Sequence, residues 1–166
     1  MAAQPREPVS AFVALGANLG DPAQAVTHAL SGLAQLPQTR LLAASSLYES
    51  APLEAEGPRY VNAVAALSTA LNAHELLQAL QAMEHQAGRQ RSVQNAPRTL
   101  DLDVLFYGEA RIDSAWLTVP HPRWRSRAFV LWPLQEIAPE RVDAQMLARV
   151  ADQSIGRSAS VICDSK

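Results

Sequence analysis

The sequence predicts an α+β domain in which a ferredoxin-like antiparallel sheet is packed against helices. Two segments carry apolar residues at helical spacing, and four others have the alternation or apolar runs of strands. These six segments follow one another as β-α-β-β-α-β, an order typical of this arrangement. Because 166 residues suit one buried core, a single domain is predicted over residues 1–166.

The first predicted strand spans residues 9–15 and runs into a glycine-containing turn. Asp21 is a suitable N-cap for the helix that follows, and Pro22 suits its first position. Apolar residues then recur every three to four positions until a proline ends the pattern. The second and third strands are predicted over residues 41–50 and 60–69, separated by a loop with proline and glycine.

The second predicted helix begins after Asn72, because Asn72 and Glu75 have the spacing of a capping box. Gly88 is a suitable residue for its end. Residues 100–107 alternate strongly and form the fourth predicted strand. The remaining predicted elements are a turn with a short extended segment and two helices, over residues 108–112, 129–137 and 143–152.

The composition excludes several classes of protein. A net charge of −2 offers no general basic field for nucleic acid or an anionic membrane. No apolar run approaches the roughly 20 residues that span a bilayer, and the first residues lack the pattern of a secretory signal. Cys163 is the single cysteine, which excludes an internal disulfide and a cysteine-based zinc site. We expect a cytoplasmic protein with no nucleic-acid or membrane partner, and we predict that it is a monomer.

Nearly all the basic residues are arginine. Thirteen of the fourteen are Arg, and the exception is Lys166 at the end of the chain. A P-loop, which needs a lysine directly after its glycines, is therefore excluded. Phosphates would have to be bound by guanidinium groups, whose planar donors match phosphate oxygens in pairs. Two groups of arginines flank the fourth predicted strand: Arg89, Arg91 and Arg98 before it, and Arg123, Arg125 and Arg127 after it.

Asp101 and Asp103 are the sharpest chemical feature of the sequence. Side chains alternate along a strand, so both carboxylates lie on one face while Leu102 points to the other. Their Cα atoms are expected roughly 6.5–7 Å apart, which suits one or two Mg²⁺ ions. The alternative is a pair of solvated acids on the polar face of a half-buried strand. Paired acids, two arginine groups and no catalytic lysine together favour a Mg²⁺–nucleotide site.

Three other residues are candidates for ligand binding. His121 stands between two prolines, which restrict the backbone around it, although a single histidine is more often structural. Tyr60 and Asn62 share one face of the third predicted strand. An aromatic ring beside an amide that donates and accepts can stack on a flat heterocycle and bind its edge. Without further support, an ordinary surface pair is the simpler interpretation.

Five segments resemble the 6-hydroxymethyl-7,8-dihydropterin pyrophosphokinase family. The most specific is Pro-Arg-Thr-Leu-Asp-Leu-Asp at residues 97–103, followed by Leu-Thr-Val-Pro-His at 117–121. The others are Leu-Gly-Ala-Asn-Leu at 15–19, Tyr-Val-Asn-Ala at 60–63 and Arg-Ala-Phe-Val-Leu-Trp-Pro-Leu at 127–134. They occur in order over about residues 12–140, and the resemblance also implies the ferredoxin-like fold.

The resemblance implies that the β,γ-diphosphate of ATP is transferred to the pterin hydroxymethyl group, with release of AMP. By the same motifs, Asp101 and Asp103 would hold two Mg²⁺ ions, and Arg89 and Arg98 would stabilise charge on the transferred group. The positions implied for ATP and its phosphates are Gln81, Glu84, Arg89, Arg91, Arg98, Thr118, His121 and Arg127. The positions implied for the pterin are Ser50, Leu53, Tyr60, Asn62 and Phe129, with Tyr60 and Phe129 stacking on the ring.

The chain departs from the family pattern at three places. Residues 94–96 are Gln-Asn-Ala where many members have Arg-Trp-Gly before the Pro-Arg pair. Trp116 replaces an arginine, and Pro122 stands where an aromatic residue is common. The loops at residues 52–59 and 89–98 are candidate lids over the site. The departures therefore affect the expected lid and ATP contacts, whereas the metal pair is retained.

Three alternatives to the kinase differ from it in the residues that they require. A non-catalytic ligand-binding domain of ferredoxin-like fold would not need the paired carboxylates. An RNA-binding module would require a basic sheet face with exposed aromatic residues, where this chain has acids. A relative that kept the pocket but lost the chemistry is disfavoured by the retained acids and arginines.

Overall fold

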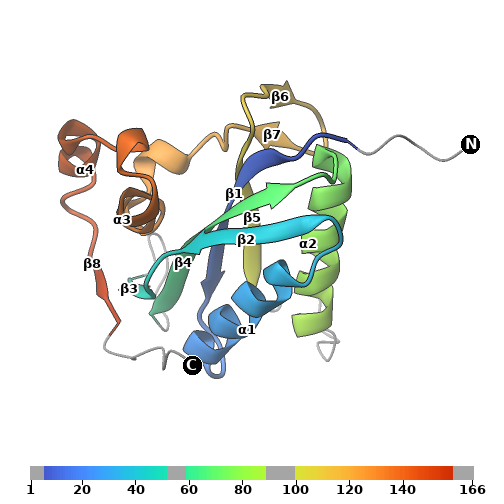
Figure 1. The fold of residues 1–166 in the computed structure, drawn as a ribbon. Helices are drawn as coiled ribbons and strands as arrows, with labels where there is room; N and C mark the ends of the chain where they lie inside the picture. The colour runs from blue at the N-terminus through green and yellow to red at the C-terminus, as the bar shows by residue number, and fades with distance from the viewer. Residues whose placement is uncertain (1–5, 52–58, 89–99, 159–166) are drawn as a thin grey trace, which may run out of the picture.

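One antiparallel sheet organises the chain in a computed structural model that describes residues 6–51, 59–88 and 100–158 (Figure 1). Its strands run in the order β5-β1-β4-β3-β8, and β2 also pairs with β4. The strands of this sheet are β1 (Val9–Ala17), β2 (Thr39–Ala44), β3 (Tyr48–Ser50), β4 (Tyr60–Thr69), β5 (Asp101–Tyr107) and β8 (Ile155–Arg157). The predicted mixture of an antiparallel sheet with helices is therefore confirmed.

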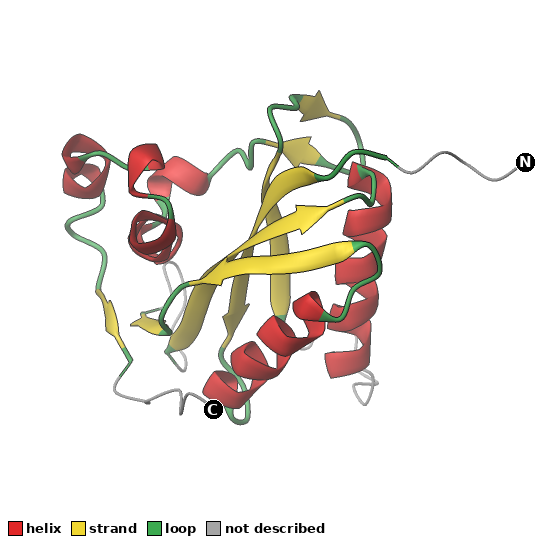
Figure 2. Cartoon of the chain, viewed as in Figure 1, coloured by secondary structure: helices red, strands yellow, loops and turns green. Residues whose placement is uncertain are grey.

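Helices cover both faces of the sheet (Figure 2). Helices α1 (Pro22–Ala34) and α2 (Ala73–Gly88) pack on one face, where the larger cluster of buried apolar residues lies. Helix α3 (Ala128–Ile137) packs on the other face over a smaller cluster. Each long strand contributes to both clusters, because neighbouring side chains point to opposite faces. In the described part of the chain, no helix is long and apolar enough to cross a membrane.

The local signals for the two N-terminal helices are confirmed by their caps. The Asp21 side chain accepts a hydrogen bond from the backbone N–H of Gln24 at 3.1 Å. Asn72 and Glu75 exchange two bonds, of 2.7 and 2.8 Å, in a reciprocal capping box. Each cap satisfies N–H groups that have no partner within the helix.

The single strand predicted over residues 41–50 is wrong, because the segment is divided into β2 and β3. The register explains the division. Ala44 is paired with Ala65, and Tyr48 is paired with Asn62. The chain therefore advances four residues from Ala44 to Tyr48 while β4 advances only three. Ser45 pairs with Val64 through its backbone and through its hydroxyl, which accepts from the Val64 N–H at 2.9 Å. One extra residue is therefore inserted after Ser45, as in a β-bulge.

The second half of the chain adds elements that the sequence pattern predicted only in part. Helix α3 matches the predicted helix within one residue, whereas α4 (Ala144–Arg149) is shorter than predicted. The hairpin of β6 (Ile112–Asp113) and β7 (Thr118–Val119) and the strand β8 were not predicted as such. Two 3-10 helices, η1 (Trp124–Ser126) and η2 (Pro139–Arg141), flank α3. Strands of two or three residues leave too little alternation to be recognised.

Candidate active site

A cavity of about 240 Å³ opens on the α3 side of the sheet, next to the first turn of α3. It brings together side chains from β1, β3, β4, β5 and α3, which are far apart in the sequence. The residues that line it are Ala14, Leu15, Gly16, Ser50, Ala51, Tyr60, Asn62, Asp101, Asp103, Arg127 and Phe129. Seven of these are predicted site residues: Ser50, Tyr60, Asn62, Asp101, Asp103, Arg127 and Phe129.

The central strand β1 contributes small residues between the two polar sides of the cavity. Gly16 is paired with Asn62 on one side and with Asp101 on the other, and Ala14 is paired with Asp103. A Cβ atom at Gly16 would lie 3.1 Å from Oδ1 of Asn62, so a larger residue would press on that amide. Glycine and alanine therefore leave the sheet open between the acids and the amide.

The two aspartates project as the alternation of β5 predicts. Asp101 and Asp103 line the cavity, whereas Leu102 is 4% exposed and belongs to the core under α1 and α2. The backbone N–H of Leu102 donates to Oε2 of Glu84 on α2 at 2.8 Å. Glu84 thus anchors the strand at the residue between the two acids.

His121 lies near Asp103 and is not among the residues that line the cavity. Its backbone N–H donates to the carbonyl of Leu105 at 2.9 Å, which ties the loop to β5. Its ring atom Nδ1 accepts from the N–H of Arg123 at 3.0 Å. Burial lowers the pKa of His121, the nearby Asp103 opposes that shift, and the charges of Arg127 and Arg123 add to it. A neutral ring that accepts at Nδ1 carries its proton on Nε2 and is a hydrogen-bond donor there.

The opposite side of the cavity combines a buried amide with aromatic rings. The Asn62 side-chain nitrogen donates to the Ser50 hydroxyl at 2.7 Å, and both residues are nearly fully buried. Tyr60 lies two residues from Asn62 on the same face of β4. The guanidinium of Arg127 lies 5.3 Å from the centre of the Phe129 ring, which is within cation–π range.

Several predicted site residues lie elsewhere. Gln81 and Glu84 are on α2, and Thr118 lines a separate open hollow with residues of β6 and β7. Four further predicted residues are outside the described part of the chain: Leu53, Arg89, Arg91 and Arg98. Residues 94–96, which depart from the family pattern, also lie outside it.

Sequence reasoning assigned no role to Ala14, Gly16 and Ala51, which line the cavity. The signal for the first two was present in the small residues at alternate positions of a buried strand. Their importance depends on pairing with both β4 and β5, which the pattern of β1 alone does not reveal.

The acid pair fits a magnesium ion shared with phosphates. In the described ranges, no group of three or more His, Cys, Asp and Glu side chains is placed to hold a metal. Two carboxylates at one edge of a cavity, Asp101 and Asp103, are nonetheless the donor set that Mg²⁺ uses when phosphates and water complete its shell. The chemistry of these donors therefore suits a Mg²⁺–nucleotide complex better than a metal held by protein alone.

The family model described as 7,8-dihydro-6-hydroxymethylpterin-pyrophosphokinase (HPPK) matches residues 12–139. The chain belongs to this family. The match includes the seven predicted residues of the cavity. It confirms the family predicted from the motifs, and with it the prediction that the chain is an enzyme, a pyrophosphokinase.

Relatives of similar length share much of the sequence. The chain is 51% identical over 130 residues to a protein of Pseudomonas aeruginosa, a match that covers 78% of this chain and 80% of the relative. It is 41% identical over 148 residues to one of Haemophilus influenzae, with 87% and 92% covered. Both are named 2-amino-4-hydroxy-6-hydroxymethyldihydropteridine pyrophosphokinase.

Solved structures of larger proteins share the fold of this chain. The wild-type HPPK-DHPS of Plasmodium falciparum superposes with a TM-score of 0.62 at 11% identity, covering 90% of this chain and 42% of that one. The same protein with pterin and p-hydroxybenzoate gives a TM-score of 0.63 at 13% identity, covering 83% of this chain and 41% of that one. This HPPK chain therefore spans less than half of those proteins, and the likeness concerns the fold alone.

Proposed function

We propose that the chain transfers the diphosphate of ATP, as one unit, to 6-hydroxymethyl-7,8-dihydropterin and releases AMP, a step of folate biosynthesis. The observation that carries this proposal is the cavity, in which an acid pair faces a buried amide and aromatic rings. One side of the cavity suits metal-bound phosphates and the other suits a flat heterocycle. We also propose that the β-α-β-β-α-β part of the chain is ferredoxin-like, which its strand order supports.

In the proposed reaction, the hydroxymethyl oxygen attacks the β-phosphorus of ATP and forms a new O–P bond. The bond from that phosphorus to the α,β-bridging oxygen breaks, AMP leaves with the electron pair, and the hydroxyl proton passes to solvent. His121 suits a donor to phosphate oxygen better than a base, because its neutral ring carries the proton on Nε2. Positioning and charge stabilisation are the main demands of such a transfer.

Asp101 and Asp103 would hold Mg²⁺, and two ions are proposed. When bound, the metal would neutralise phosphate charge and polarise the attacking oxygen. The carboxylates need no large movement for this role, because both already line the cavity. Glu84 accepts a hydrogen bond from the backbone N–H of Leu102, between the two aspartates, and so helps to position them from the opposite face of the sheet.

The pterin would lie against Phe129 and Tyr60, with its polar edge at Asn62. The bond from Asn62 to Ser50 fixes the amide orientation, so the polar edge of the ring system meets a preorganised partner. Arg127 lies over Phe129 and near His121, so its charge is available where the pterin meets the phosphates. The other ATP contacts proposed from the motifs are those of Gln81, Glu84, Arg89, Arg91, Arg98 and Thr118, and Leu53 is proposed to contact the pterin.

The deciding experiment is to incubate the purified protein with ATP, Mg²⁺ and 6-hydroxymethyl-7,8-dihydropterin and to identify the nucleotide formed. Pterin-dependent AMP is expected. ADP would show a single-phosphoryl kinase, and binding of both ligands without either product would favour a non-catalytic ligand-binding domain. A cytoplasmic location and a monomeric state remain predictions, the second of which light scattering tests directly.

A further inference from the structure

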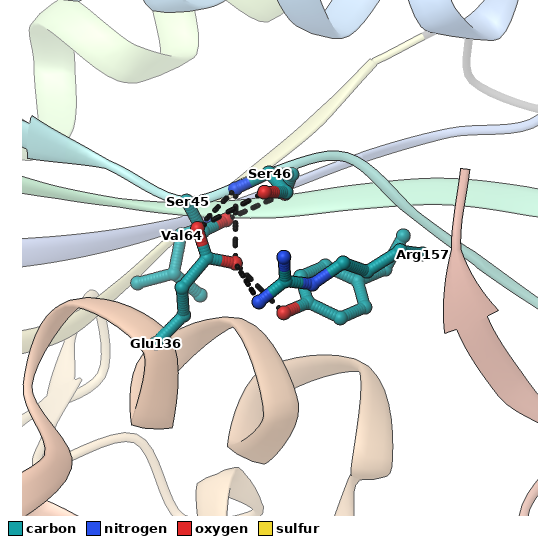
Figure 3. A network of polar contacts seen from close by, with 6 residues as sticks. Ser45, Ser46, Val64, Glu136 and Arg157 are labelled. Atoms are coloured by element: carbon teal, nitrogen blue, oxygen red, sulfur yellow. Dashed lines mark hydrogen bonds and ion pairs between the residues drawn. The ribbon is translucent and has the colours of Figure 1, made fainter. Parts of the chain in front are cut away.

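The carboxylate of Glu136 joins helix α3 to the bulge between β2 and β3 (Figure 3). It accepts hydrogen bonds from the backbone N–H of Ser46 at 3.0 and 3.1 Å and from the Ser46 hydroxyl at 3.0 Å. The Tyr48 hydroxyl donates to it at 2.7 Å, and the Arg157 guanidinium lies 3.6 Å away. One side chain thus connects α3, β3 and β8.

The bulge explains why a carboxylate is needed at this place. Ser45 still pairs with Val64, but the extra residue that follows moves the backbone of Ser46 out of register with β4. Its N–H then meets the carboxylate of Glu136, which satisfies a backbone donor that the bulge releases. Glu136 therefore binds to the irregularity itself as well as to neighbouring side chains.

The carboxylate is held in its charged form. Burial alone would raise the pKa of Glu136, but hydrogen bonds from Tyr48 and Ser46 and the charge of Arg157 together hold it below its ordinary value. Only 24% of the accessible surface of the Glu136 side chain is exposed. Several donors thus converge on a side chain that is turned toward the protein.

Both elements that Glu136 joins also line the cavity, α3 through Phe129 and β3 through Ser50. Phe129 and Glu136 are seven residues apart on α3, so they share one face of the helix about 10 Å apart along its axis. Ser46 and Ser50 are four residues apart, or about 13 Å along an extended chain. The contact between α3 and β3 therefore has Glu136 at one end and the cavity residues Phe129 and Ser50 at the other.

We propose that Glu136 is a positioning residue for the pterin: by holding α3 against β3, it sets the separation between Phe129 and the Ser50–Asn62 side of the cavity. The inference rests on the proposed function for the identity of the ligand. Loss of the carboxylate would let the first turn of α3 shift relative to β3, so the ring system would lose stacking and edge contacts together. Phosphate binding would be largely retained, because the acid pair and His121 are held by β5 and its neighbouring loop, although Arg127 lies at the start of α3.

The test compares Glu136→Ala and Glu136→Gln with the wild type. The dissociation constants of 6-hydroxymethylpterin and of an ATP analogue are measured by calorimetry, and AMP formation is followed alongside. We expect the pterin constant to rise about tenfold in Glu136→Ala and less in Glu136→Gln, which keeps one acceptor oxygen. The ATP-analogue constant is expected to change by less than about twofold.

Two control variants separate positioning from general stability. Val26→Ala removes buried volume in α1, on the opposite face of the sheet, and lowers stability without touching the α3–β3 contact. Glu140→Ala removes an exposed acid just beyond α3. Neither is expected to change pterin binding by more than about twofold at a temperature where all variants are folded.

Unchanged pterin affinity in Glu136→Ala would overturn the proposal, and so would an equal loss of affinity for both ligands. AMP formation by the wild type with unchanged pterin binding in the variant would reject the positioning role alone. A wild type that binds pterin but forms no AMP would reject the proposed reaction, and the ratio of pterin constants would still decide the role of Glu136. If the wild type does not bind pterin, both proposals fail.

Discussion

The two faces of the sheet use the same strands for different purposes. On the face under α1 and α2, residues such as Val13, Leu67 and Leu102 are at most 4% exposed and form the larger apolar core. On the other face, α3 covers an apolar cluster, and the sheet beyond that cluster is open to the cavity. Asp103 lies in this open part, one residue from Leu102 in the sequence.

This difference shows how a small enzyme supports a polar site without giving up a core. Because side chains alternate along a strand, one residue stabilises the fold and the next is available for chemistry. Changes on the face under α1 and α2 should therefore affect mainly the free energy of unfolding. Changes on the open face should affect mainly binding and turnover.

The difference between the two faces is tested most directly by changing one residue on each face. Asp103→Ala is expected to reduce turnover by at least about 10²–10³-fold, because a proposed ligand of the Mg²⁺ that would neutralise the phosphates is lost. Its free energy of unfolding should stay close to that of the wild type, since Asp103 is exposed. Steady-state AMP formation and chemical denaturation measure the two effects.

The matched variant on the other face is Leu67→Ala. Leu67 is fully buried, so we expect a loss of about 2–5 kcal/mol of stability. Turnover per folded molecule should be nearly normal. Near-normal turnover in Asp103→Ala would remove its metal role, and a large catalytic defect in folded Leu67→Ala would remove the separation of the two faces.

Phe129→Ala should weaken pterin binding by about tenfold, which corresponds to about 1.4 kcal/mol of lost stacking. Fluorescence or calorimetric titration with the pterin measures this effect. Trp132→Ala is the control, because Trp132 is an aromatic residue of the same helix that does not line the cavity. Equal effects of the two changes would mean that only the stability of α3 matters.

Gly16→Ala is expected to raise the KM for the pterin by a few-fold, since the new methyl group would lie 3.1 Å from Oδ1 of Asn62. Steady-state kinetics with the pterin as the varied substrate measure the change. Gly156→Ala in β8 meets no atom within 4 Å and should leave the KM unchanged. A Gly16→Ala enzyme with wild-type kinetics would show that Asn62 can move without cost.

The smallest expected effect concerns pH and the Glu136 contact. Because the pKa of Glu136 is lowered in the folded state, its carboxylate stabilises the fold above the ordinary carboxyl value of about 4.5. This contribution is lost as the pH falls through the lower folded-state pKa. Because the Arg157 side chain is exposed and that of Glu136 partly so, about 0.5–1 kcal/mol is expected.

The measurement for this effect is the free energy of unfolding of the wild type and of Glu136→Gln between pH 7 and pH 3. The advantage of the wild type should shrink as the pH falls. A constant difference over this range would show that hydrogen-bond geometry, and not charge, accounts for the contribution of Glu136.

Most of the first four predicted strands and both N-terminal helices followed from local patterns. The caps at Asp21 and Asn72 involve residues three positions away, so they can be recognised from the local sequence. The break at Ser45 and Ser46 was not predictable in this way. The acceptor for the Ser46 N–H is the carboxylate of Glu136, 90 residues later, so no residue near Ser46 in the sequence indicates the contact.

The candidate site was predictable where a strand pattern or a motif named its residues. Alternation placed Asp101 and Asp103 together, and the motifs added Ser50, Phe129 and Arg127. The motifs also suggested a direct nucleotide role for Glu84. In the structure Glu84 holds the backbone between the two acids, a contact that depends on how α2 packs against β5.

Local spacing and motifs were enough to predict the family, the order of the main elements and the face on which most strand residues lie. Three features became visible only in the fold: the small residues of β1 between the acids and the amide, the bulge that separates β2 from β3, and the contact of Glu136 with that bulge. The physical reason is that register and helix packing arise from contacts between distant segments. Local spacing specifies which side chains share a face, and the pairing of strands specifies which of them meet.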